Sequence, residues 1–357
     1  MIKKLVKIAP FSIVVLAVGL LSLPRSSLAE PIRRGLNVAT SIDEDGINTL
    51  QAWGANLVRY QLAWPERVNA ASAEEYAAWL AAALQRLDAL LPIFKARGIT
   101  VLLDLHTPPG GFFRETFPSK FRIFEEEWAR ELLTESWRMI ALRYKGDSSI
   151  WAFELVSEPA TGRPGGNPLW PHMAAALVKE VLAIDPTRRI VLAADYASYS
   201  RLNKFAKKIK RAINISTSST FEQNLIFSAH LFLPYAYVKQ GLGHLPTPVS
   251  YPSQKYNLEK LKATLAAFEK SLRKRPRIVN SQVLIGEFSV VRWAPGAADY
   301  LNDFLSIIES YGWNWTYQIF REDSTWSVEH GADPRDSTPS AGENDRAIVL
   351  KGYLSRN

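Results

Sequence analysis

The chain has 357 residues, of which 47% are hydrophobic and 22% charged, a composition typical of a globular protein with a large core. It contains no cysteine, which excludes a disulfide framework, thiolate metal sites and a cysteine nucleophile. The formal charge of +8 falls to +4 after residue 29, because the first 29 residues carry four basic side chains and no acidic one. We therefore expect no nucleic-acid partner, and the densest basic run, residues 201–211, is predicted to be the solvated face of a helix.

Residues 1–29 have the three-part pattern of a secretory signal peptide. Lysines form a basic start, residues 8–23 are almost wholly apolar, and Ser27-Leu28-Ala29 supplies small residues for cleavage before Glu30. An uncleaved membrane anchor is the alternative. We expect residues 30–357 to form one domain, exported to the periplasm or the extracellular space, monomeric and without stable membrane insertion.

Beyond the signal segment, short apolar runs alternate with amphipathic runs of helical spacing. The runs predicted to be β-strands are residues 35–39, 56–62, 99–105, 150–156, 189–193, 225–229, 283–286 and 313–319. The predicted helices are residues 42–53, 74–96, 122–144, 169–184, 199–211, 258–274, 297–311 and 346–354. This alternation predicts an α/β fold, a single (β/α)8 TIM barrel with its catalytic groups at the C-terminal ends of the strands. A doubly wound open sheet is disfavoured, because the first strand is not followed by a glycine-rich dinucleotide fingerprint.

Charged residues occur where several predicted strands end. The fourth strand runs into Glu158, and Pro159, which has no backbone N–H, prevents any further pairing. The seventh strand has the same form and ends in Glu287. Three other strands place Arg59, His106 and His230 near the same end. Because the C-terminal ends of barrel strands meet at one mouth, we expect these five side chains to form one site.

Two carboxyl groups that face each other across such a mouth suit the cleavage of a glycosidic bond. One must be protonated to donate to the leaving oxygen, and the other must be ionised to attack the anomeric carbon or to activate water. Arg59 would keep the second carboxylate ionised. Carboxyl groups ~5–5.5 Å apart would give retention of configuration, and ~6.5–9.5 Å would give inversion.

No cofactor and no metal is expected. The chain has five His, no His-x-x-x-His or His-x-His pair, no phosphate-binding loop and no Gly-x-Ser-x-Gly elbow. The 11 Trp residues offer flat rings on which sugars can stack. The candidate platforms, in or near predicted strand-end loops, are Trp64, Trp170, Trp293, Trp313, Trp315 and Trp326. Core packing is the alternative for about half of them.

In these motifs, residues 35 to about 330 resemble the family 5 glycoside hydrolases, the large cellulase family of retaining (β/α)8 enzymes. The resemblance rests on residues 56–64, 104–110, 153–159 and 285–288 and on the His230 strand. It implies that Glu158 is the general acid/base and that Glu287 is the nucleophile. Arg59, His106 and His230 match other positions at the family's barrel mouth.

Three positions depart from the family's pattern. Ser157 stands where the family usually has the Asn that bonds the sugar 2-hydroxyl. Phe232 replaces the Tyr of the sixth strand, for which Tyr235 or Tyr237 is a candidate replacement, and Gln318 takes the place of the usual subsite Trp. Each departure would cost about 1–3 kcal/mol of transition-state stabilisation if uncompensated.

The leading interpretation is a retaining β-glycosidase that hydrolyses a β-linked glucan by double displacement. Its partner is then a polysaccharide or oligosaccharide substrate. A mannanase, a β-1,3-glucanase or a transglycosylase on the same scaffold is an alternative, and so is a glycan-binding protein that has lost most of its catalysis.

Overall fold

The computed structural model describes residues 31–64, 72–163, 166–213, 223–274 and 277–356. The predicted signal segment, residues 1–29, lies outside the described residues. From Ile32 onward the chain forms one compact unit.

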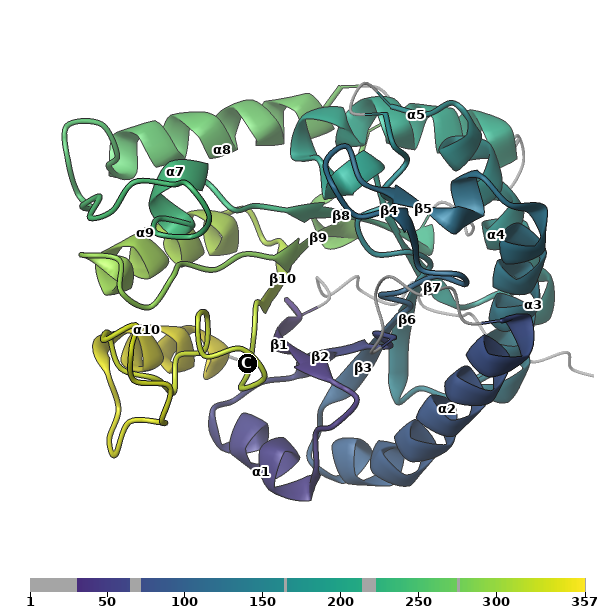
Figure 1. Ribbon diagram of the computed structural model, residues 1–357, viewed down its shortest axis with the longest axis horizontal. Helices are drawn as coiled ribbons and strands as arrows, with labels where there is room; N and C mark the ends of the chain where they lie inside the picture. The colour runs from purple at the N-terminus through teal and green to yellow at the C-terminus, as the bar shows by residue number, and fades with distance from the viewer. Residues whose placement is uncertain (1–30, 65–71, 164–165, 214–222, 275–276, 357) are drawn as a thin grey trace, which may run out of the picture. The chain divides into compact units, whose positions relative to one another are not determined.

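Within the described residues, eight parallel strands close into a barrel (Figure 1). The strands are β1 (Arg34–Ala39), β2 (Leu57–Gln61), β3 (Thr100–Asp104), β6 (Ile150–Glu154), β7 (Arg189–Ala193), β8 (Leu225–His230), β9 (Val283–Glu287) and β10 (Asn314–Tyr317). Their order around the barrel is β1-β10-β9-β8-β7-β6-β3-β2, so each strand pairs with its neighbours in the chain apart from the inserted hairpin described below. The predicted strands and the TIM-barrel architecture are confirmed.

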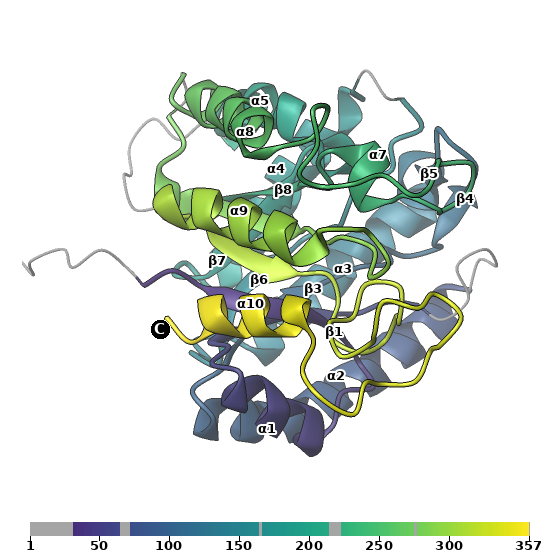
Figure 2. The same ribbon diagram turned by 90° about the vertical axis from the view of Figure 1, so that its left-hand side faces the viewer.

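Helices cover the outside of the barrel in chain order (Figures 1 and 2). They are α1 (Glu44–Ala52), α2 (Ala73–Ala96), α3 (Glu127–Arg143), α4 (Leu169–Ile184), α5 (Leu202–Ile213), α8 (Leu258–Leu272), α9 (Ala297–Ser310) and α10 (Asp345–Leu354). Side-chain caps begin several of them: Ser72 and Glu75 form a capping box at α2, and Asn257 caps α8. The predicted helix 122–144 begins later, at Glu127, because residues 122–124 form a separate 3-10 turn.

Two elements that were not predicted lie among the loops. Strands β4 (Phe112–Arg114) and β5 (Lys120–Phe121) form an antiparallel hairpin after β3, and α7 (Tyr235–Val238) is a short helix after β8. Figure 2 shows this hairpin, α7 and residues 321–344 on the side of the barrel opposite the C-terminus. These insertions follow the C-terminal ends of their strands and therefore form the walls of the barrel mouth.

The barrel interior changes from apolar to charged along the strands. An apolar layer is formed by Leu57, Leu102, Trp151, Ala152, Val191, Ile226 and Leu284. Side chains alternate between the two faces of a strand, so the residue two positions further on points to the same side. On β2, β3 and β6 those next residues are Arg59, Asp104 and Glu154, all with no exposed surface. The floor of the mouth is therefore a buried charged layer above an apolar one.

Candidate active site

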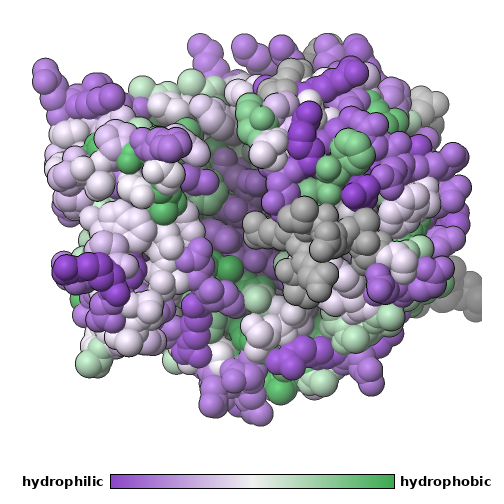
Figure 3. Space-filling model, viewed as in Figure 1, coloured by the Kyte–Doolittle hydropathy of each residue, from purple (hydrophilic) through white to green (hydrophobic). Residues whose placement is uncertain are grey.

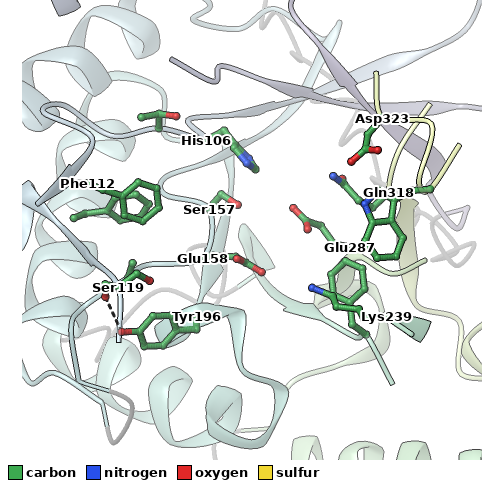
Figure 4. A pocket seen from close by; sticks show the side chains of 15 residues that line it. His106, Phe112, Ser119, Ser157, Glu158, Tyr196, Lys239, Glu287, Gln318 and Asp323 are labelled. Carbon is green, nitrogen blue, oxygen red and sulfur yellow. Dashed lines mark hydrogen bonds between the residues drawn. The ribbon is translucent and has the colours of Figure 1, made fainter. Parts of the chain in front are cut away.

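A pocket of about 370 Å³ opens at the C-terminal ends of the strands. Figure 3 shows the corresponding face of the molecule hollowed near its centre, with a hydrophilic floor. Five of the predicted site residues line the pocket, namely His106, Ser157, Glu158, Glu287 and Gln318 (Figure 4). Two more, Arg59 and His230, contact these residues from beneath and beside the pocket.

Arg59, on β2, connects the acidic groups beneath the pocket. Its Nε donates to Oε2 of Glu154 at 2.6 Å, and its Nη1 donates to Oε1 of Glu287 at 2.8 Å. Its Nη2 lies 3.0 Å from Oδ2 of Asp104 and donates to Oγ of Ser157 at 2.8 Å. The planar guanidinium group therefore holds four side chains from three other strand ends in fixed directions.

Burial and charge act in opposite directions on this cluster. Burial alone would lower the pKa of Arg59, but Asp104, Glu154 and Glu287 outweigh it and raise that pKa above its ordinary value. Burial raises the pKa of Glu154, although Arg59 opposes the shift. Arg59 is therefore a permanent cation beside Glu287, and burial makes Glu154 easier to protonate than an ordinary Glu.

Glu158 follows β6 with an unusual backbone. Its φ is +40°, a left-handed conformation that costs a non-glycine residue about 1–3 kcal/mol. This turn, with Pro159 behind it, directs the carboxylate into the pocket, where the side chain is 49% exposed (Figure 4). Partial burial alone would raise the pKa of this carboxyl group. The hydrogen bond and positive charge of His230 reverse the shift and lower the pKa of Glu158 to about 2.

His230, at the end of β8, lies between the two predicted catalytic carboxylates. Its Nδ1 is 2.7 Å from Oε1 of Glu158 and 3.5 Å from Oε2 of Glu287. Burial would lower the pKa of His230, but Glu287 and Glu158 raise it. One ligand-type atom from each of these three residues lies within 4.8 Å of the others. The geometry thus brings two carboxylates and a protonatable ring into one small volume.

Gly286 makes room for this ring. A Cβ added at Gly286 would lie 2.5 Å from Oγ of Ser228 and 3.1 Å from Nε2 of His230. Because β8 and β9 are neighbours in the sheet, any larger residue at this position would displace the imidazole from the two carboxylates. The glycine of the Ile-Gly-Glu287-Phe motif is therefore part of the site.

The three positions that depart from the family's pattern make definite contacts. Ser157 is buried and accepts a hydrogen bond from Arg59. The ring of Phe232 lines the pocket beside Trp326, with centroids 5.8 Å apart. Oε1 of Gln318 accepts a hydrogen bond from Nδ2 of Asn37 at 2.5 Å. None of these contacts disturbs the Arg59–Glu287 pair.

Three residues predicted to bind substrate do not line this pocket. Trp315 is fully buried, and its indole N–H donates to Oε1 of Glu309 on α9, so it packs between the barrel and a helix. Trp293 donates to the carbonyl of Gln240 and lines a different hollow. Tyr235 is 57% exposed and also lines a different hollow.

The proposed replacement for the missing tyrosine hydroxyl is also corrected. Tyr237 is fully buried, and its hydroxyl donates to the carbonyl of Pro295 at 3.1 Å. Neither Tyr235 nor Tyr237 lines the pocket that contains Glu287. In the described residues, the place beside Phe232 is taken by a lysine ammonium, that of Lys239.

Sequence reasoning missed several members of the site. Glu154 is the last residue of β6, two positions after Ala152 of the inward apolar layer, and this spacing is a signal that would have identified it. Lys239 and Asp323, which were not predicted, also line the pocket, and so does the candidate platform Trp326. Lys239 directly follows α7, and Asp323 and Trp326 lie in the irregular segment 321–344, where no periodic pattern indicates which side chains turn inward.

Comparisons with known proteins identify a family for this chain. The family model described as cellulase (glycosyl hydrolase family 5) matches residues 31–322. Endoglucanase C of Acetivibrio thermocellus is 24% identical over 326 residues, which cover 80% of this chain and 88% of that protein.

Solved structures of the same fold are also similar. Endoglucanase Cel5A of Thermotoga maritima superposes with a TM-score of 0.64 at 19% identity, over 89% of this chain and 96% of that one. The cellulose synthase subunit Z of Clostridioides difficile superposes with a TM-score of 0.65 at 18% identity, over 89% of this chain and 99% of that one.

Proposed function

This chain belongs to the cellulase family, glycosyl hydrolase family 5, and we propose that it hydrolyses β-linked glucans, as an endoglucanase, with retention of configuration. Family membership makes it a glycoside hydrolase with a polysaccharide substrate. The relatives named endoglucanases support a glucan as that polysaccharide. The signal-like residues 1–29 support export of the enzyme to where such polymers are found.

The observation that carries the mechanism is the close approach of Glu158 and Glu287. One oxygen of each lies within 4.8 Å of the other, a spacing in keeping with the ~5–5.5 Å carboxyl separation of retaining enzymes. Arg59 donates to Oε1 of Glu287, and the other carboxylate oxygen, Oε2, lies 3.5 Å from Nδ1 of His230. Glu287 is thus paired with a cation and held in one orientation, as a nucleophile requires.

The proposed reaction has two steps. Glu287 attacks the anomeric carbon, and the bond to the leaving oxygen breaks as Glu158 donates its proton to that oxygen. Glu158, now ionised, then takes a proton from water as the water attacks the same carbon and releases Glu287. Each step inverts the anomeric carbon, so the product keeps the β configuration.

His230 has a specific place in this cycle. In the free enzyme its raised pKa keeps the proton on the ring, and Glu158 is ionised. The 2.7 Å hydrogen bond from Nδ1 to Oε1 is a direct path along which that proton reaches Glu158. Transfer leaves a neutral ring and a protonated acid beside the leaving oxygen. His230 is therefore proposed to supply the proton that Glu158 donates.

A matched pair of variants tests both roles. With an activated aryl β-cellobioside and azide, Glu287→Gly is expected to regain turnover and give the α-glycosyl azide, because azide takes the place of the carboxylate. Glu158→Gly is expected to form the glycosyl-enzyme normally and give the β-glycosyl azide. Undiminished hydrolysis by Glu287→Gly, or the same azide anomer from both variants, would overturn the assignment.

A further inference from the structure

Lys239 brings a cation into the wall of the pocket. It directly follows α7, is half-buried, and lines the pocket with Glu158 and Glu287. Figure 4 shows its side chain near Glu287, across the pocket from Phe112, Ser119 and Tyr196. Its Nζ lies 4.2 Å from the ring centroid of Phe232, 5.3 Å from that of Tyr235 and 5.9 Å from that of Trp326.

This ammonium has no carboxylate partner in the part of the chain that the structure describes. Its contacts there are with ring faces only. The acids that line the pocket are already engaged: Glu158 by His230, Glu287 by Arg59, and Asp323, whose Oδ1 accepts from the backbone N–H of Thr325 at 2.8 Å. Aromatic faces hold a cation in place without neutralising it. Lys239 is thus a positioned charge open to an anion that enters the pocket.

The ammonium also changes what Phe232 can do. A neutral sugar is usually bound by stacking on an aromatic face. Nζ lies over one face of the Phe232 ring, 4.2 Å from the centroid, so a sugar ring cannot stack on that face. The part of the pocket beside Phe232 therefore favours a charged group on the substrate over the apolar face of a sugar.

We propose that the β-linked glucan hydrolysed here is an acidic one, with a carboxylate on a sugar near the cleavage point that pairs with Nζ of Lys239. The inference rests on the proposed function and names its substrate class. The pairing would also assist the chemistry: after His230 and His106, Lys239 is a further cation that lowers the pKa of Glu158. A substrate carboxylate that neutralises Lys239 weakens this effect and favours the protonated acid.

The test compares two substrates that differ only in charge. Cello-oligosaccharides oxidised at C6, in which glucuronic acid replaces some glucose, are assayed beside the same oligosaccharides after carboxyl reduction. The wild-type enzyme is expected to show a kcat/KM about tenfold higher for the acidic form, the scale of one partly buried ion pair, and the ratio should fall as salt is raised. Lys239→Met is expected to bring the ratio close to one, mainly through a higher KM for the acidic form.

Lys208→Met is the matched control, because Lys208 is an exposed lysine on α5 and its loss changes the net charge equally. It should leave the acidic-to-neutral ratio at the wild-type value. Equal hydrolysis of both substrates by the wild type, or a ratio that Lys239→Met does not change, would overturn the inference while leaving the hydrolase proposal intact. No hydrolysis of either form would instead overturn the proposed function.

Discussion

The Nδ1 atom of His230 lies 2.7 Å from Oε1 of Glu158, and the same atom lies 3.5 Å from the other predicted catalytic carboxylate. A proton on this ring is stabilised by both carboxylates, which explains why the pKa of His230 is raised and that of Glu158 is lowered to about 2. His230 and Glu158 therefore share one proton, and together they hold it to a higher pH than either group would alone.

The decline of kcat/KM at alkaline pH tests whether His230 and Glu158 share a proton. In the wild type, kcat/KM should fall only above about pH 6.5, the ordinary His value, because the pair releases its proton at the raised pKa of His230. In His230→Asn the proton must be held by Glu158 alone, so the limb should move about one pH unit or more to the acid side. A pH–rate profile for both enzymes measures the shift. A limb that stays in place would show that His230 does not hold the proton.

The left-handed backbone of Glu158 predicts a difference between two inactive variants. Glycine adopts a φ of +40° without steric cost, whereas alanine does not. Glu158→Gly should therefore be more stable than Glu158→Ala by about 1 kcal/mol, although both lose the same hydrogen bond to His230. Urea unfolding of the two variants measures the difference. Equal stability would mean that the turn relaxes and stores no strain.

Glu154 predicts a contrast between a neutral and an apolar replacement. Glu154→Gln keeps an oxygen for Nε of Arg59, so it should cost under about 1 kcal/mol. Glu154→Ala leaves Nε of Arg59 unpaired in a fully buried place and should cost about 3 kcal/mol or more.

The pH dependence of stability gives an independent check on Glu154. Its pKa is raised in the folded state, so its contribution is complete below the unfolded value of about 4.5 and is lost as pH rises through the folded pKa. Unfolding free energies from pH 4 to pH 8 should therefore decline more in the wild type than in Glu154→Gln. A steeper decline in the variant would contradict the raised pKa.

Variants of Trp326 and Trp315 distinguish a role in substrate binding from a role in core packing. Trp326 lines the pocket, so Trp326→Ala should raise KM about tenfold through loss of an aromatic contact. Trp315 is buried between β10 and α9, so Trp315→Phe should lower the unfolding free energy by about 1–2 kcal/mol and leave kcat/KM within about twofold. Steady-state kinetics and thermal melting of both variants distinguish the roles. A large rise in KM for Trp315→Phe would show instead that Trp315 contributes to substrate binding.

The fold and the centre of the site were predictable because both depend on periodic sequence patterns. Strand runs such as residues 150–156 and 283–286 stand out from the helices between them, and barrel topology then brings their ends together. Glu158 and Glu287 were found because a charge at the end of an apolar strand interrupts the pattern.

The misplaced residues show where such patterns carry no information. On β10, residues on both faces of the strand are buried, so hydrophobicity does not reveal that Trp315 faces α9 while Thr316 contacts β9. Lys239 and Trp326 enter the pocket from loops whose path follows no periodic pattern. Near Trp326, for example, the backbone N–H of Thr325 donates to Oδ1 of Asp323 and forms a local turn. Sequence spacing within a loop does not predict which side chain turns inward.

The stereochemistry of hydrolysis tests the central claim, two glutamates acting by double displacement, most directly. Proton NMR can follow the anomeric signals of the new reducing end in the first minutes of cello-oligosaccharide hydrolysis, before mutarotation. Double displacement predicts that the β-anomer appears first and the α-anomer later, at the rate of mutarotation. Initial appearance of the α-anomer would show a single displacement and would contradict the role assigned to Glu287.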